Sequence, residues 1–223
     1  MNKHKTPEEQ RLALQKGNKL SKAIGGPYPS ERQWGTVRED YCKDGVTEQK
    51  RIIWTIGHST RTIKEFIDML KSFHIECVVD IRSFPGSRRY PHFNKEAFEV
   101  SLPENNIKYI HLRDLGGRRR VKPDSINTGW RLAAFRGYAD YMETSSFKKA
   151  IKDLERYGSK ERIAYMCSES LWWRCHRSLV SDYLKLHGWT VFHIMGIGKT
   201  QEHTYTSPSQ IVNGELLYSA AKI

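Results

Sequence analysis

The chain has 223 residues, 38% of them hydrophobic, which suffices for one domain of ordinary size with an extension. Its net charge of +12 favours an anionic partner, such as a nucleotide, a nucleic acid or a phosphorylated metabolite, although a generally basic soluble protein would have the same charge. No apolar run approaches the roughly 18 residues that a transmembrane helix needs, and no apolar signal segment follows Met1, so we expect no membrane partner. The four cysteines are irregularly spaced, so we expect a cytoplasmic protein with reduced thiols.

Residues 1–50 differ in character from the rest of the chain. Residues 7–22 have weak helical periodicity, and the breaker cluster Gly25-Gly-Pro-Tyr-Pro-Ser30 follows them. We interpret this region as an N-terminal arm anchored by Trp34 and Tyr41, with a partly disordered tail as the alternative. Residues 51–223 form the predicted α/β domain.

From residue 51 onward, short apolar runs alternate with amphipathic segments. The segment 62–73 has apolar residues at three- and four-residue intervals, and Thr62 and Glu65 have the spacing of a capping box. We predict strands at 52–56, 77–81, 107–112, 163–166 and 190–195, with helices at 62–73, 94–102 and 174–186 and one long or two broken helices within 133–156. This alternation predicts a three-layer, Rossmann-like α/β fold, with about five mainly parallel strands and helices on both faces.

Distinctive residues follow the carboxyl ends of these strands, which is where open α/β sheets bind ligands. Parallel strands bring their carboxyl ends to one edge, so we expect these residues to gather in one site. They are His58 and Ser59 after the first strand, Asp80 and Arg82 at the second, Leu115, Gly116 and Gly117 after the third, Cys167 and Glu169 after the fourth, and Gly196 and Gly198 after the fifth.

The stretch from Cys167 to Arg177 carries the most chemical information. Cys175, His176 and Arg177 fall at or near a predicted helix start, where unpaired amides and neighbouring arginines favour anions and lower the pKa of a thiol. Cys175 is therefore a candidate nucleophile, and Arg177 is a candidate to bind phosphate through two N–H groups of its guanidinium, as a fork. The alternative is a buried structural cysteine beside a capping histidine, and Cys167 also fits a small apolar residue that ends a buried strand.

Two other interpretations of this stretch fit less well. Tyrosine phosphatases place five residues between their cysteine and arginine, whereas six residues separate Cys167 from Arg174. A zinc site from Cys167, Cys175 and His176, with His58 as a further ligand, lacks the paired Cys-x-x-Cys spacing of structural zinc sites. We therefore assign no metal and no cofactor to the chain from its sequence.

Candidates for proton transfer lie at the same strand ends. Glu169 is a candidate general acid or base, because a carboxylate at a strand end is partly desolvated. His58 is a candidate base or hydrogen-bond donor, with a backbone-bonded histidine as the alternative. Asp80 is expected to orient Arg82 through an ion pair.

Basic residues and aromatic residues share the loops beside this edge. Arginines interleaved with aromatics are typical of a groove for a nucleotide or a single nucleic-acid strand, and solvated basic loops are the alternative. The basic residues are Arg88, Arg89, Arg118, Arg119, Arg120 and Lys122, and the aromatic residues are Tyr90, His92, Phe93, Trp130 and Phe135.

Several motifs together resemble a known family, the bacterial and archaeal domain of unknown function family 488, over about residues 51–200. The resemblance implies a compact α/β domain of a cytoplasmic protein, and it implies no established reaction or cofactor. Its motifs are Thr55-Ile-Gly-His-Ser-Thr60, Val79-Asp-Ile-Arg82 with Pro85, Leu115-Gly-Gly117, Phe135-Arg-Gly-Tyr-Ala-Asp-Tyr141, Met166-Cys-Ser-Glu169 and Cys175-His-Arg177. Separately, residues 27–41 are similar to a short segment of glycoside hydrolase 63-type glucosidases; no glycosidase activity follows, because the catalytic barrel of those enzymes is absent.

The sequence thus predicts an enzyme that acts on an anionic substrate, a nucleotide or a nucleic acid. A non-catalytic nucleic-acid-binding module is the first alternative, a Cys/His metal or redox protein is the second, and the oligomeric state stays open. We assign catalysis to His58, Glu169, Cys175 and His176, substrate binding to Ser59, Arg82, Gly116, Gly117, Cys167 and Arg177, and nucleic-acid binding to Arg88, Arg89, Arg118, Arg119, Arg120 and Lys122.

Overall fold

The computed structural model describes residues 51–220 of the chain. The predicted N-terminal arm and its glucosidase-like segment lie outside the described residues. No helix within the described range is long and apolar enough to cross a membrane.

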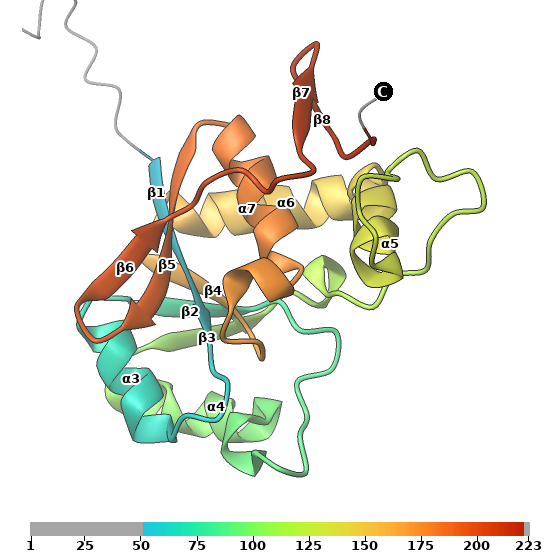
Figure 1. Ribbon diagram of the computed structural model, residues 1–223. Coiled ribbons are helices and arrows are strands. Elements are labelled where there is room, and N and C mark those ends of the chain that lie inside the picture. The colour runs from blue at the N-terminus through green and yellow to red at the C-terminus, as the bar shows by residue number, and fades with distance from the viewer. Residues whose placement is uncertain (1–50, 221–223) are drawn as a thin grey trace, which may run out of the picture. The chain divides into compact units, whose positions relative to one another are not determined.

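Six strands form the central sheet, in the order β3-β2-β4-β1-β5-β6 (Figure 1). The first five strands in sequence are all parallel, which confirms the predicted sheet. They are β1 (Arg51–Gly57), β2 (Cys77–Asp80), β3 (Lys108–His111), β4 (Ile163–Cys167) and β5 (Trp189–Gly196). The register pairs Gly57 with Cys167 and Asp80 with Met166, so the carboxyl ends of β1, β2 and β4 meet side by side at one edge.

Helices cover both faces of the sheet, as expected for a three-layer α/β fold (Figure 1). One face carries α3 (Ile63–Lys71) and α4 (Lys95–Ser101), and the other carries α5 (Ala133–Met142), α6 (Ser145–Gly158) and α7 (Arg177–Leu186). Successive strand residues point to opposite faces. Ile53 therefore packs in the core beneath α5, α6 and α7, whereas Trp54 and Ile56 pack beneath α3 and α4.

The local signals in the sequence explain where the helices begin. Thr62 caps α3 and forms the predicted capping box with Glu65. The predicted segment 133–156 is two helices, because Thr144 leaves helical geometry and its side chain accepts a hydrogen bond from the amide of Phe147. Short 3₁₀ turns lie at Pro91–Phe93, Pro103–Asn105, Arg113–Leu115 and Trp172–Arg174.

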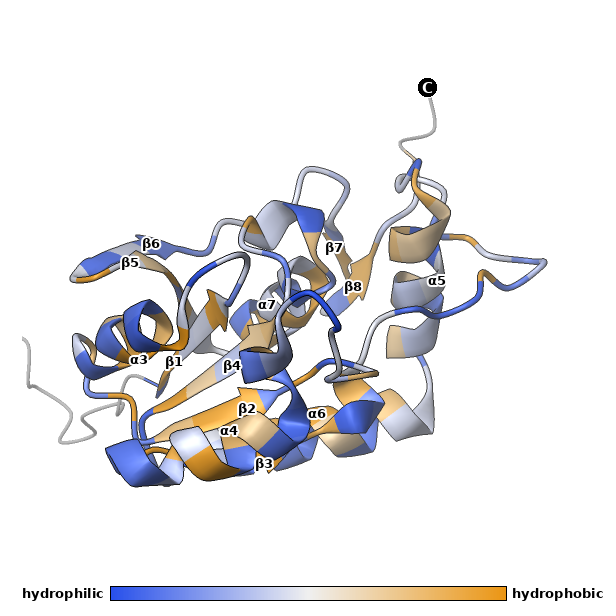
Figure 2. Cartoon of the chain, turned by 90° about the horizontal axis from the view of Figure 1, so that it is seen from below, coloured by the Kyte–Doolittle hydropathy of each residue, from blue (hydrophilic) through white to orange (hydrophobic). Residues whose placement is uncertain are grey.

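The structure contains three further strands that the hydrophobic pattern did not predict. The strand β6 (Lys199–Glu202) pairs antiparallel with β5, and its four residues are polar and exposed, so it has no apolar signature (Figure 2). The strands β7 (Gln210–Val212) and β8 (Glu215–Leu217) form a hairpin. Asn213 and Gly214 at its turn both have positive φ, and this dipeptide was the signal that could have revealed the hairpin.

Candidate functional site

A cavity of about 510 Å³ lies at the edge where β1, β2 and β4 end. Segments far apart in sequence line it, because the parallel topology delivers each strand end to the same place. The lining residues are His58, Ser59, Thr60, Arg82, Ser83, Phe84, Gly86, Ser87, Tyr90, Gly117, Arg118, Cys167, Ser168, Glu169 and His176.

His58 follows β1 and is a neutral imidazole. Its Nδ1 lies 2.9 Å from the carbonyl oxygen of Ser59, so Nδ1 carries the proton and donates it to that oxygen. Its Nε2 lies 3.4 Å from Nη1 of Arg82, and its ring stacks on Phe93. Burial lowers the pKa of His58 to about 4, so this side chain accepts hydrogen bonds through Nε2 and holds no positive charge at neutral pH.

Arg82 and Asp80 form the ion pair expected from the sequence. Nε and Nη2 of Arg82 donate to the Asp80 carboxylate, which is fully buried, and Nη2 also donates to the carbonyl oxygen of Phe93. Tyr109 donates a further hydrogen bond to Asp80 from its hydroxyl. Arg82 is therefore a fixed cation in the cavity wall, with most of its donors already engaged by the protein.

Two thiols and an imidazole meet at the floor of the cavity. Cys167 ends β4, Cys175 follows the 3₁₀ turn before α7, and His176 is the N-cap residue of α7. The two sulfur atoms and Nδ1 of His176 all lie within 4.8 Å of one another. Cys167 and His176 line the cavity, whereas Cys175 lies beneath them and is buried.

The two thiols differ in acidity. Burial acts to raise the pKa of Cys175, but the hydrogen bond from Cys167 and the charge of Arg177 outweigh it and lower this pKa to about 6. The hydrogen bond to Cys175 and burial raise the pKa of Cys167 to about 12. Cys175 is thus the more acidic of the two thiols, whereas the cysteine that lines the cavity is Cys167 and not the predicted nucleophile Cys175.

Arg177 does not reach the cavity, which corrects its expected role as a phosphate fork. Its side chain is 1% exposed and runs beneath the site, where Nη1 donates to Oγ1 of Thr55 at 3.1 Å. Its Nη2 donates to the carbonyl oxygens of Glu169 and Ser170. The first turn of α7 directs this side chain inward, so Arg177 holds the 169–170 loop and supplies positive charge under Cys175.

Glu169 lies at the cavity wall with an exposed side chain. Its backbone passes against Gly57, because a Cβ atom on Gly57 would lie 1.9 Å from the carbonyl oxygen of Glu169. Only glycine at position 57 permits this approach, so the absence of a side chain there helps to place Glu169 beside His58.

We expect Gly57→Ala to lower the free energy of unfolding by roughly 1–3 kcal/mol, because the new methyl group must displace backbone. Chemical denaturation of the two proteins measures this difference. Gly86→Ala is the matched control, because a Cβ at position 86 meets nothing within 4 Å. Equal losses for the two variants would contradict the close approach.

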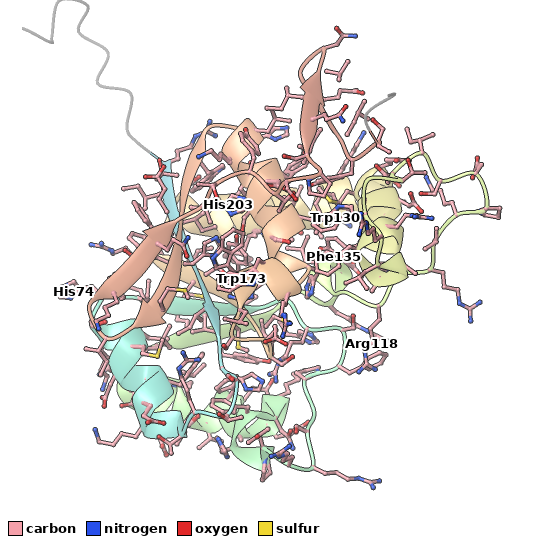
Figure 3. The ribbon with its side chains drawn as sticks, in the orientation of Figure 1. His74, Arg118, Trp130, Phe135, Trp173 and His203 are labelled. Carbon is pink, nitrogen blue, oxygen red and sulfur yellow. The ribbon has the colours of Figure 1, made fainter. Side chains whose placement is uncertain are left out.

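The structure separates the predicted basic residues into two groups. Arg118 is exposed (Figure 3) and lines the cavity. Its guanidinium lies 5.7 Å from the ring of Phe84, in the loop after β2. Arg88 and Arg89 are exposed between the lining residues Ser87 and Tyr90.

The second group does not line the cavity. Arg119 donates to the carbonyl oxygens of Gly116 and Asp114 and lies over the ring of Tyr141. Lys122 pairs with Glu143, and Arg120 is exposed away from the lining residues. Gly116 was expected to bind substrate, but it is buried, and a Cβ there would meet Ser83 at 2.3 Å; only Gly117 of this pair lines the cavity.

Residues 62–184 match the sequence model of the family described as Domain of unknown function DUF488. The chain belongs to this family. The matched range contains Arg82, Cys167, Glu169, Cys175 and His176, and it begins after the cavity residues that follow β1. A comparison with curated proteins finds no significant match, and the glucosidase-like segment finds no support.

The cavity of this DUF488 member also contains residues that the sequence reasoning did not select. Most of them carry hydroxyl groups: Thr60, Ser83, Ser87 and Ser168. Phe84 is apolar and 61% exposed at the cavity. All of them lie in the loops that follow β1, β2 or β4, so the rule that selected His58 and Arg82 would have found the hydroxyl residues among them if it had included hydroxyl side chains.

Proposed function

We propose that this DUF488 protein is an enzyme that acts on an anionic substrate, a nucleotide or one nucleotide of a single nucleic-acid strand. One observation carries the proposal: a single cavity collects a thiol, two imidazoles and a carboxylate, and exposed arginines stand at its rim. Clusters of titratable groups of this kind in a cavity are typical of catalytic sites.

The size of the cavity supports a small substrate. Its volume of about 510 Å³ falls within the range of roughly 300–1,000 Å³ that small-molecule sites occupy. A nucleotide fits such a volume, whereas a nucleic-acid duplex does not. The hydroxyl groups of the wall are suitable donors to phosphate and sugar oxygens.

The charge at the rim supports an anion. Arg118, Arg88 and Arg89 are exposed on two loops beside the cavity, and the chain as a whole has a net charge of +12. Arg82 adds a fixed positive charge at the wall, although Asp80 balances it. In this proposal Arg118 binds the anionic group, because its guanidinium is exposed at the cavity, while Arg177 acts only from beneath.

In this proposal, the catalytic groups are side chains that face the cavity. Glu169 accepts and returns a proton, since it is a carboxylate with access to substrate. His58 presents the neutral Nε2 as a hydrogen-bond acceptor. Cys167 and His176 also line the cavity and contact the reacting group there.

We expect Arg118→Ala to weaken the binding of a nucleotide or a short single strand by about 1–3 kcal/mol, the usual cost of losing a charge-assisted hydrogen bond. Raising salt from about 50 to 200 mM should weaken wild-type binding by tenfold or more if several phosphates are contacted. Fluorescence anisotropy measures both effects. Lys160→Ala removes the same charge at the opposite edge of the sheet, before β4, and should change affinity little. Absence of binding at low salt to nucleotides, single strands and duplexes would overturn the proposal.

Glu169→Gln separates an enzyme from a binding module. We expect turnover to fall by about 10²–10⁴-fold, the usual contribution of general acid–base catalysis, while affinity stays within a few-fold. The assay is mass spectrometry of products after incubation with a panel of nucleotides and oligonucleotides. Glu99→Gln, on the exposed side of α4, is the control. Retained binding without turnover of any panel member would favour a non-catalytic nucleic-acid-binding module instead.

A further inference from the structure

The floor of the cavity contains a set of atoms that the proposed function leaves without a common role. Sγ of Cys167, Sγ of Cys175 and Nδ1 of His176 converge within 4.8 Å of one another. Nδ1 of His176 lies 3.6 Å from Sγ of Cys175 and 4.0 Å from Sγ of Cys167. We propose that these three atoms bind a zinc ion whose fourth coordination position opens into the cavity.

The distances fit a tetrahedral ion. Zinc–sulfur bonds of about 2.3 Å and zinc–nitrogen bonds of about 2.0–2.1 Å place neighbouring ligand atoms about 3.5–3.8 Å apart. The separation of His176 from Cys175 already has this value, and that from Cys167 exceeds it by only a few tenths of an ångström. Two thiolates and an imidazole suit zinc, whereas magnesium and calcium prefer oxygen ligands.

The tautomer of His176 also fits a metal ligand. Nε2 lies 3.2 Å from the carbonyl oxygen of Ile81, so Nε2 carries the proton and donates it there. This leaves the lone pair of Nδ1 directed toward both sulfur atoms. Histidine ligands of metal ions are typically oriented by such a hydrogen bond from the other ring nitrogen.

Rigid elements hold the ligands in place. Cys167 is fixed at the end of β4 by its pairing with Gly57, and its carbonyl oxygen accepts a hydrogen bond from the amide of His58. Cys175 is fixed by backbone hydrogen bonds to the preceding 3₁₀ turn and from the first turn of α7. Arg177 is buried, and its guanidinium donates to the carbonyl oxygens of Glu169 and Ser170, which holds the loop between the two cysteines in place.

The fourth coordination position of the zinc ion is the one through which the ion would reach a substrate. His58 does not supply it, because Nδ1 of His58 donates to Ser59 and Nε2 faces Arg82. Cys167 and His176 line the cavity beside Ser168 and Glu169, so the open side of the cluster faces the place where substrate enters. Three protein ligands with one open position are typical of catalytic zinc rather than structural zinc. This catalytic consequence rests on the proposed function, whereas zinc binding itself does not.

The test is the metal content and the cobalt spectrum of the purified full-length chain, with no substrate present. We expect elemental analysis by inductively coupled plasma mass spectrometry to find about one zinc ion per chain. Replacement by cobalt should give the intense visible bands of a four-coordinate ion together with thiolate-to-cobalt charge-transfer bands. Cys167→Ser and His176→Gln should each lose most of the bound metal, and Cys77→Ser, which changes a buried cysteine elsewhere in the sheet, should retain it.

The cobalt spectrum of the wild-type chain tests the zinc inference even if a variant fails to fold. A folded, reduced wild-type chain that binds neither zinc nor cobalt would overturn the inference. So would the weak visible spectrum of an octahedral cobalt ion, or a Cys167–Cys175 disulfide in place of the metal. Failure of anion binding in a chain that holds zinc would count only against the proposed function. Anion binding by a chain without zinc would count only against the metal site.

Discussion

Asp182→Asn is expected to lower the free energy of unfolding by about 3–5 kcal/mol, the usual cost of breaking a buried charged network. Asp182 lies in α7 and is fully buried. Its carboxylate accepts hydrogen bonds from Nε2 of His203 at 2.8 Å, the amide and hydroxyl of Thr206, and the hydroxyl of Tyr218. These three partners all belong to the segment that follows β6, and Figure 3 shows His203 beside α7.

The reason for the large effect is that asparagine puts an amino group where several donors converge and removes the charge that they stabilise. Urea denaturation monitored by tryptophan fluorescence gives the difference. Asp153→Asn is the control, because Asp153 forms a partly exposed ion pair with Arg156, and such pairs contribute about 0–1 kcal/mol. A loss below about 1 kcal/mol for Asp182→Asn would show that the network does not hold the C-terminal segment to α7.

The folded protein is expected to lose about 4 kcal/mol of stability between pH 7 and pH 5, about 2 kcal/mol from each of two buried histidines. Burial lowers the pKa of His58 to about 4 and that of His193 to about 2, against an ordinary value of 6.5. The unfolded histidines bind protons as the pH falls through 6.5, whereas the folded ones stay neutral. This contribution is therefore fully present above pH 6.5 and is lost progressively below it.

Denaturation at several pH values between 7 and 5 measures the slope. His193→Gln should flatten the slope by about half, because glutamine keeps a donor toward His203 and does not titrate in this range. His74→Asn should leave the slope unchanged, since the side chain of His74 is exposed and asparagine tolerates its positive φ. Stability that is constant from pH 7 to pH 5 would contradict the neutral, buried state of these histidines.

The apolar pattern was sufficient to predict the parallel sheet and its helices. The strands β2 and β4 are buried along their whole length, so β4 reads as a continuous apolar run, as does β2 up to Asp80 at its end. The strand β6 could not be found in this way, because Lys199–Glu202 is exposed and owes its conformation to hydrogen bonds with the edge of β5. The extra strand is set by tertiary pairing and not by its own composition.

The candidate site was predictable in position but not in detail. The topology rule located His58, Arg82, Cys167 and Glu169 at one edge, and all four line the cavity. The direction of Arg177 could not be predicted, because it depends on the rotation of the first turn of α7 and on acceptors in the preceding 169–170 loop and at Thr55 of β1.

The close approach of the two thiols to His176 could not be predicted from the sequence either. Seven residues separate Cys167 from Cys175 in sequence, and no standard metal spacing marks them. The 3₁₀ turn at Trp172–Arg174 folds the intervening loop back, and this places Cys175 under the end of β4. The same is true of the network around Asp182, whose partners lie in a segment with no periodic pattern.

A crystal structure of the full-length protein with a bound nucleoside monophosphate tests most directly the claim that this edge of the sheet is an anion-binding catalytic site. The account predicts the nucleotide within the cavity, with its phosphate at hydrogen-bond distance from Arg118 and its reacting end between Glu169 and the Cys167–His176 floor. A nucleotide bound on another surface, with water alone in the cavity, would contradict it.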